Sequence, residues 1–152
     1  WITFLDDTYC FQIAMGIFFL LWANDIGAYF CGKAVGKRKL FERISPKKTW
    51  EGTIGGGLFT LAIAFIISIY FKYLHVFEWE IIALIIIVCG TYGDLVESML
   101  KRNIQIKDSG SLLKGHGGFL DRFDSLLLVI PFIFIFLFFW RFLILISLFG
   151  FH

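Results

Sequence analysis

Acidic residues recur at helical spacing in two stretches of the chain, and each stretch borders a long apolar run. The first stretch begins at Asp94. Three polar residues follow it at positions i+3, i+4 and i+7 and would share its face of a helix: Glu97, Ser98 and Lys101. The second stretch repeats the spacing with Asp121, Asp124 and Ser125. If both helices enter a membrane from the same side, Asp94 and Asp121 come together. Paired carboxylates of this kind suit Mg²⁺, which binds one or two carboxylates together with waters and phosphate oxygens.

Basic residues and glycines lie around these carboxylates in the sequence. The basic side chains suited to phosphate are Lys101, Arg102, Lys107 and Arg122. Gly115, Gly117 and Gly118 allow close backbone approach and present amide donors, as phosphate-holding loops require. His116 between them is, taken alone, more often a structural hydrogen-bonding residue than a catalyst. Together these residues predict a site for a phosphate-rich substrate at the face of a membrane.

The elements that must position these residues are membrane-spanning helices. The chain is 59% hydrophobic and only 17% charged, whereas a soluble domain is nearer half apolar and a quarter charged. A helix needs about 20 mostly apolar residues to cross a bilayer. We therefore expect an all-α, polytopic integral membrane protein. Its four spans are predicted at about residues 8–32, 53–72, 79–98 and 124–146.

The distribution of lysine and arginine predicts how these spans are oriented. Basic residues gather in two loops, 33–52 and 99–123, while the loop between spans two and three is short. An excess of lysine and arginine marks cytoplasmic loops. We therefore expect both basic loops, and with them the predicted phosphate site, on the cytoplasmic side of the membrane, with both ends of the chain on the other side.

Two of the predicted spans carry carboxylates. The third span is long enough only if it continues through Asp94 and Glu97, and Asn24 and Asp25 lie near the end of the first span. A carboxylate in a spanning helix costs on the order of a few kcal/mol unless it faces a protein interior, water or a cation. One interpretation of these carboxylates is that they belong to a functional site. The other is that each lies at a helix end among the lipid headgroups, and this second interpretation is weaker for Asp94 than for Asp25.

Residues 98–125, with the sequence SMLKRNIQIKDSGSLLKGHGGFLDRFDS, resemble the signature of the CDP-diacylglycerol synthases, also called phosphatidate cytidylyltransferases. The matching positions are Ser98, Lys101, Arg102, Lys107, Asp108, Gly110, His116, Gly117, Gly118, Asp121, Arg122 and Asp124. Residues 24–37, 45–52 and 93–98 also resemble segments of that family. There are two departures from the family pattern. Lys114 stands where the family usually has proline or glycine, and family members are typically longer. We therefore expect the chain, which begins at Trp1, to be the C-terminal part of a longer protein.

The resemblance implies a single membrane-embedded cytidylyltransferase domain over residues 1–152. Such an enzyme joins CTP and phosphatidic acid, releases pyrophosphate and requires Mg²⁺. Its partners are these two substrates and the lipid bilayer, with no nucleic acid, and a homodimer is left open. The residues expected to be catalytic are Asp94, Asp121, Lys101, Arg102 and Arg122, with Asp94, Asp121 and Asp124 as metal ligands. The residues expected to bind substrate are Ser45, Lys47, Lys48, Thr49, Ser98, Lys107, Asp108, His116, Gly117 and Gly118.

The stretch SPKKTWEG, residues 45–52, has two interpretations. It is either a basic topology marker or a loop that folds over the Asp94 and Asp121 site and contacts phosphates. Pro46, the hydroxyls of Ser45 and Thr49, and Gly52 favour the loop, because a topology marker needs none of them.

Two other classes of protein remain as alternatives. A transporter could bind a cation in transit at Asp25 and Asp94, but transport needs polar groups along a path through the membrane. The apolar run of the second predicted span, residues 52–71, and the main apolar run of the fourth carry no charge. A non-catalytic lipid-binding module would use the basic loops alone, which leaves Asp94, Asp121 and Asp124 unexplained.

Overall fold

Long helices dominate the fold. The computed structural model describes residues 4–5, 8–9, 11–41, 45–103 and 120–149, although some side chains next to the gaps are not described. Four helices occur in these ranges: α1 (Phe11–Val35), α2 (Trp50–Tyr70), α3 (Val76–Asn103) and α4 (Leu120–Phe149). Each contains a segment that is long and apolar enough to cross a membrane. The expectation of a polytopic helical membrane protein is confirmed.

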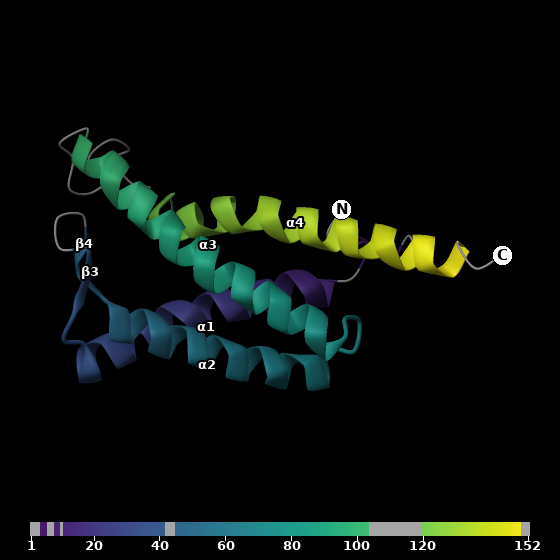
Figure 1. Cartoon of the computed structure of the whole chain (residues 1–152), viewed down its shortest axis with the longest axis horizontal. Coiled ribbons are helices and arrows are strands. Elements are labelled where there is room, and N and C mark those ends of the chain that lie inside the picture. The colour runs from purple at the N-terminus through teal and green to yellow at the C-terminus, as the bar shows by residue number, and fades with distance from the viewer. Residues whose placement is uncertain (1–3, 6–7, 10, 42–44, 104–119, 150–152) are drawn as a thin grey trace.

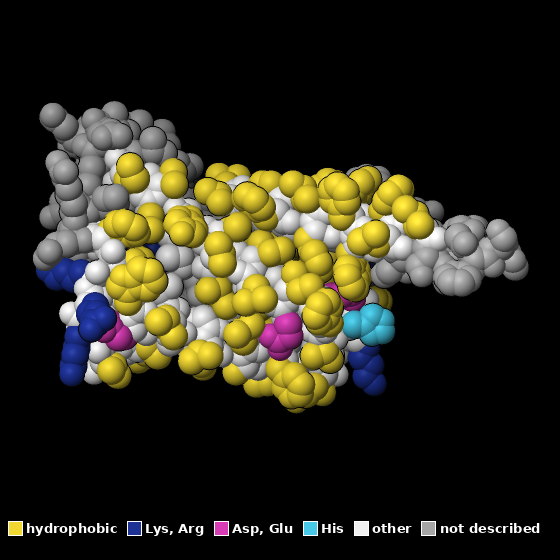
Figure 2. All heavy atoms as spheres, in the orientation of Figure 1, with side chains coloured by type: hydrophobic (Ala, Val, Ile, Leu, Met, Phe, Trp, Pro, Cys, Tyr) yellow, Lys and Arg dark blue, Asp and Glu magenta, His cyan; other side chains and the backbone are white. Residues whose placement is uncertain are grey.

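The helices run antiparallel to one another in chain order, with α3 in the middle of the bundle (Figure 1). Helices α1 and α3 end, and α2 and α4 begin, at the side of the bundle drawn on the left. Helix α3 packs against each of the other three helices, and α1 also packs along α2. The two ends of the bundle differ in charge. In Figure 2 the lysine and arginine side chains lie mainly at the left end, next to a flank of apolar side chains.

The apolar core is built around Trp79 of α3, whose side chain is fully buried. Its indole N–H donates to the carbonyl of Phe71 at 3.3 Å, and its ring lies against Gly16 of α1, where no side chain larger than hydrogen fits. Other core residues come from all four helices: Ile13, Leu20, Ala64, Ile67, Ile82, Ile86, Val129 and Ile133. Apolar packing therefore joins the four helices where these residues meet.

Small residues bring α1 and α2 into backbone contact. Gly52 and Gly56 are four residues apart on α2, the spacing that lets two helices in a membrane approach closely. A Cβ atom at Gly56 would lie 2.7 Å from the backbone nitrogen of Ala28, and one at Gly52 would lie 2.9 Å from the Cα of Gly32. These glycines fix the position of α2 against the C-terminal half of α1.

The turn between α2 and α3 is closed by an acidic cap. The carboxylate of Glu78, in the first turn of α3, accepts the backbone N–H of His75 at 2.6 Å. This is the glutamate half of a capping box, which satisfies a backbone donor at the start of a helix. The cap accounts for the start of α3 at Val76, three residues earlier than the predicted span.

Two short hairpins accompany the helices, and the all-helical expectation missed both. Strand β1 (Phe4–Leu5) pairs with β2 (Thr8–Tyr9), and β3 (Lys39–Phe41) pairs with β4 (Ser45–Thr49), both antiparallel. The second hairpin lies inside the basic loop between α1 and α2. Its strands are short and rich in charge, and they lack the alternation of apolar and polar residues that identifies a strand in a sequence.

Candidate active site

A cavity of about 520 Å³ lies among α1, the start of α2 and α3, at the end of the bundle that carries the β3–β4 hairpin. Its lining residues are Asn24, Asp25, Ala28, Tyr29, Gly32, Lys33, Lys48, Thr49, Gly52, Thr53, Thr91 and Asp94. Three helices and strand β4 therefore contribute to one space. Among these elements, β4 supplies Lys48 and Thr49 and α3 supplies Asp94, three of the residues that the sequence assigned to a site.

Helix α1 lines the cavity with Asn24 and Asp25. Asn24 is buried, and its amide nitrogen lies near Gly90 of α3, where a Cβ atom would be 3.7 Å away. Asp25 lies ten residues before the end of α1 at Val35, which is about 15 Å along a helix. The structure therefore places Asp25 inside the helix and on a cavity wall. This position favours the interpretation of Asp25 as a site residue over a helix end at the headgroups.

The β3–β4 hairpin is held by hydrogen bonds to the start of α2. Thr49 is the N-cap of α2, and its hydroxyl accepts the backbone N–H of Gly52 at 3.2 Å. The backbone N–H of Trp50 donates to the carbonyl of Arg38 at 3.0 Å. The carboxylate of Glu51 accepts the backbone N–H groups of Lys37 and Arg38, the latter at 3.1 Å. These bonds fix the end of β4, and with it the backbone next to Lys48.

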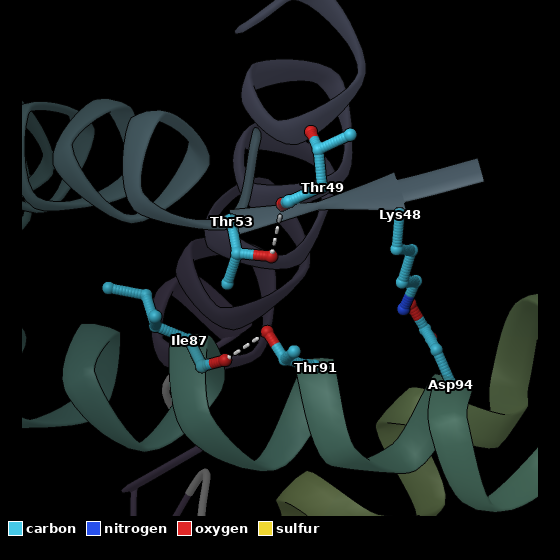
Figure 3. Close-up of polar contacts among 6 residues, drawn as sticks. All are labelled: Lys48, Thr49, Thr53, Ile87, Thr91 and Asp94. Carbon is cyan, nitrogen blue, oxygen red and sulfur yellow. Dashed lines mark hydrogen bonds and ion pairs between the residues drawn. The ribbon is translucent and has the colours of Figure 1, made fainter. Parts of the chain in front are cut away.

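Lys48 reaches from β4 to α3 and forms an ion pair with Asp94 (Figure 3). The lysine side chain is 28% exposed and the aspartate side chain 31% exposed, so the pair is partly open to the cavity. The stretch 45–49 is therefore more than a charged connection, because it places a cation directly on a carboxylate of the neighbouring helix. Sequence reasoning brought this stretch to the site but did not predict the ion pair.

Two threonines on the cavity wall were not predicted from the sequence. The hydroxyl of Thr53 donates to the carbonyl of Thr49 at 3.1 Å, and that of Thr91 donates to the carbonyl of Ile87 at 2.7 Å. Since each hydroxyl proton is used within its own segment, the oxygen lone pairs are what remain for a ligand. Thr91 could have been found from the sequence, because it lies three residues before Asp94 and so on the same helical face.

Comparison with known proteins identifies the relatives of this chain. A model of the cytidylyltransferase family matches residues 6–140. The chain belongs to the cytidylyltransferase family. A phosphatidate cytidylyltransferase of Bacillus subtilis is 49% identical over 119 residues, which cover 76% of this chain and 43% of the relative. A protein of the same name from Haemophilus influenzae is 48% identical over 128 residues, covering 81% of this chain and 44% of the relative. The chain thus spans less than half the length of these relatives.

The donor set of the cavity fits a hard divalent cation in this family member. Asp25 and Asp94 supply carboxylate oxygens and Asn24 an amide oxygen, the ligand types that Mg²⁺ prefers, and Mg²⁺ usually keeps several waters. The ammonium group of Lys48 already lies against Asp94 as a cation. Among the described residues no three acidic, histidine or cysteine side chains form a cluster of metal-binding geometry.

The other predicted residues of the cytidylyltransferase site are placed only in part. Helix α3 continues unbroken past Asp94 to Asn103, so the predicted helical face that also carries Ser98 exists. Helix α4 begins at Leu120, one residue before Asp121. Ser45 opens β4 and is half-buried. Side chains that are not described belong to Lys47, Lys101, Arg102, Asp121, Arg122 and Asp124. Residues outside the described ranges are Lys107, Asp108, His116, Gly117 and Gly118.

Proposed function

We propose that the protein carrying this chain is a phosphatidate cytidylyltransferase, which transfers CMP from CTP to phosphatidic acid and yields CDP-diacylglycerol and pyrophosphate. The observation that carries this proposal is the cavity on which Lys48 and Asp94 meet, at one end of an apolar helical bundle. Both curated relatives compared above bear this name. A polar site at the end of a membrane bundle suits a reaction between a soluble nucleotide and a lipid headgroup.

The reaction needs charge neutralisation more than proton transfer. A phosphate oxygen of phosphatidic acid attacks the α-phosphorus of CTP, the new P–O bond forms, and the bond to the β-phosphate oxygen breaks as pyrophosphate leaves. The nucleophile is already an anion at neutral pH, so a general base is not required. Phosphoryl-type transfers are accelerated mainly by positioning and by electrostatic stabilisation. Cationic groups beside the cavity are therefore the residues we expect to do most of the catalytic work.

We assign these roles to the residues that the sequence and the cavity single out. Asp94, with Asp121 and Asp124 from the start of α4, would hold Mg²⁺, which when bound neutralises phosphate charge. Lys48 and Thr49 would contact phosphates from the β4 side. The basic residues that would contact the triphosphate or the phosphatidate from the other side are Lys101, Arg102, Lys107 and Arg122.

The proposal places the site at the cytoplasmic face of a bacterial inner membrane. The basic residues of β3, β4 and the turn before them lie at the cavity end of the bundle, and an excess of lysine and arginine marks cytoplasmic loops. CTP is made and used in the cytoplasm, so it would meet the cavity there, while the apolar flank of the helices keeps the acyl chains of phosphatidic acid in lipid. The homodimer that the sequence left open remains a proposal as well.

A pyrophosphate-release assay tests the proposed function. We would replace the matching segment of the Bacillus subtilis relative by this chain, reconstitute the chimera in phosphatidylcholine vesicles and measure pyrophosphate on adding CTP, Mg²⁺ and phosphatidic acid. We expect release that requires all three. A folded chimera that inserts into the vesicles but releases no pyrophosphate would contradict the proposal. Ion flux across the vesicle membrane, or phosphatidate binding without turnover, would point to the transporter or the lipid-binding module.

A further inference from the structure

The ion pair between Lys48 and Asp94 joins two groups to which the proposed function gives separate tasks. Asp94 is assigned to a metal ion and Lys48 to a phosphate, yet in the structure each binds the other. An ion pair that served only to stabilise the fold would be expected to lie away from a ligand-binding cavity. This one lies on the wall of the cavity, with 28% of the lysine side chain and 31% of the aspartate side chain exposed.

The surroundings of the pair allow it to open without disturbing the fold. The backbone beside Lys48 is fixed by the Thr49 cap and the hairpin, while its four-carbon side chain is flexible. An ion pair between partly exposed groups is weak, because water screens the charges and both side chains lose freedom when they pair. A divalent cation carries twice the charge of an ammonium group and can bind the same carboxylate together with water. Exchange at Asp94 would therefore happen at the cavity wall.

We propose that Lys48 is an internal counter-ion, which occupies the cation position on Asp94 in the empty site and yields it to a divalent cation, so that its ammonium group is freed for the substrate phosphates. The inference rests on the proposed function, because it presumes a metal and phosphates in this cavity. It explains why a lysine stands here. A lysine is a compact point charge that exchanges readily, whereas an arginine would grip the carboxylate with two parallel hydrogen bonds.

Binding of Mn²⁺ without any nucleotide tests this proposal independently of catalysis. The chain is placed in nanodiscs of zwitterionic phosphatidylcholine, which avoids metal binding by anionic lipid, and free Mn²⁺ is read from its electron paramagnetic resonance spectrum. Lys48→Met removes the competing cation, so Mn²⁺ should bind about threefold to fivefold more tightly than to wild type, which is the most that loss of so weak an ion pair allows. Lys48→Arg should bind Mn²⁺ no more tightly than wild type. Asp94→Asn should weaken binding in both the wild-type and the Lys48→Met background.

Lys33→Met is the matched control. Lys33 lines the same cavity, but its ammonium group lies 6.0 Å from the ring centroid of Tyr29. Lys33→Met removes one positive charge from the cavity wall but leaves the ion pair between Lys48 and Asp94 in place. The affinity for Mn²⁺ should therefore change much less than in Lys48→Met. Equal gains in the two variants, or no gain in Lys48→Met, would overturn the proposal. Pyrophosphate release is measured separately, so a failed Mn²⁺ result with intact turnover rejects the counter-ion and spares the proposed function.

Discussion

Asp94 lies nine residues before the end of α3 at Asn103, which is about 13 Å along the helix. At that position it belongs to a spanning helix and also to the wall of the cavity. The neighbouring polar groups make the carboxylate tolerable there: Lys48 pairs with it, and Thr91 lies one turn earlier on the same face. A carboxylate so placed is able to hold a cation because it is not isolated in lipid.

Replacing Asp94 by asparagine keeps the shape of the side chain and removes its charge. We expect pyrophosphate release to fall a hundredfold or more at saturating Mg²⁺, which corresponds to about 2.7 kcal/mol of transition-state stabilisation. The fold should survive, because the ion pair that is lost is partly exposed and contributes little to stability. Asp121→Asn should lose activity to a similar extent if both carboxylates hold the metal.

The matched control for Asp94→Asn is Glu80→Gln, which makes the same chemical change on the same helix but near its other end. Glu80→Gln should keep near-wild-type turnover, and thermal unfolding in detergent should show that all the variants remain folded. Near-normal activity of Asp94→Asn and Asp121→Asn would remove both residues from the metal site.

The helices themselves were largely predictable, because their signal is a long apolar run. The predicted second span, 53–72, falls within three residues of α2 (Trp50–Tyr70) at each end. Helix α3 was harder to delimit, since its apolar run stops before Asp94 while the helix continues to Asn103. The β3–β4 hairpin could not be predicted, because hydrogen bonds made only in the folded chain hold it in place. The carboxylate of Glu51 accepts the backbone N–H of Arg38, 13 residues earlier in the chain, and the hydroxyl of Thr49 accepts the backbone N–H of Gly52 in the first turn of α2. Pairings that depend on tertiary contacts leave no periodic pattern.

The α1–α2 contact gives a prediction that separates two adjacent glycines. In Gly56→Ala the new methyl group would lie 2.7 Å from the backbone nitrogen of Ala28, and a backbone cannot yield as a side chain can. In Gly57→Ala it would lie 3.3 Å from the side chain of Ile87, which can adjust. Overpacking of a tight contact costs about 1–3 kcal/mol, so Gly56→Ala should be less stable than Gly57→Ala by that amount.

Both glycine variants gain the same helix propensity, so their difference isolates the packing at the contact. Thermal unfolding of the two variants in the same detergent measures it. Since Gly56 and the cavity residue Gly52 lie on the same face of α2, Gly56→Ala should also lower pyrophosphate release by changing the distance between α1 and α2. Equal stability of the two variants would show that α1 and α2 are not held by close backbone contact.

The whole molecule is divided along its length into an apolar part and a polar end. Fully buried core residues such as Ile13 and Trp79 lie in the N-terminal turns of α1 and α3. The cavity residues Asn24, Thr91 and Asp94 lie later in the same two helices. Because α1 and α3 run in the same direction (Figure 1), the polar cavity residues of both helices lie toward the same end of the bundle. Such a division suits a protein whose chemistry takes place at one face of the membrane.

This division predicts which ends of the helices face the cytoplasm. Lys47 on β4 lies at the cavity end, and His75 lies in the turn at the opposite end of α2. Lys114, outside the described residues, follows α3 and is expected at the cavity end. Each of the three is replaced singly by cysteine in a background without Cys10, Cys31 and Cys89, and intact cells are treated with a membrane-impermeant thiol reagent. Only His75→Cys should be labelled.

Permeabilised cells provide the control, because the reagent then reaches both faces and all three cysteines should react. Protection of Lys47→Cys and Lys114→Cys that persists after permeabilisation would mean that burial, and not the membrane, shields them. Labelling of either one in intact cells would place the cavity outside the cytoplasm, where CTP is absent. Two spans, α2 and α3, separate Lys47 from Lys114 in the chain. If both helices cross the membrane, the two positions lie on the same side and must be labelled or protected together. If they differ, one of these two helices does not cross the membrane, and the site assembled from α1, α2 and α3 could not exist as described.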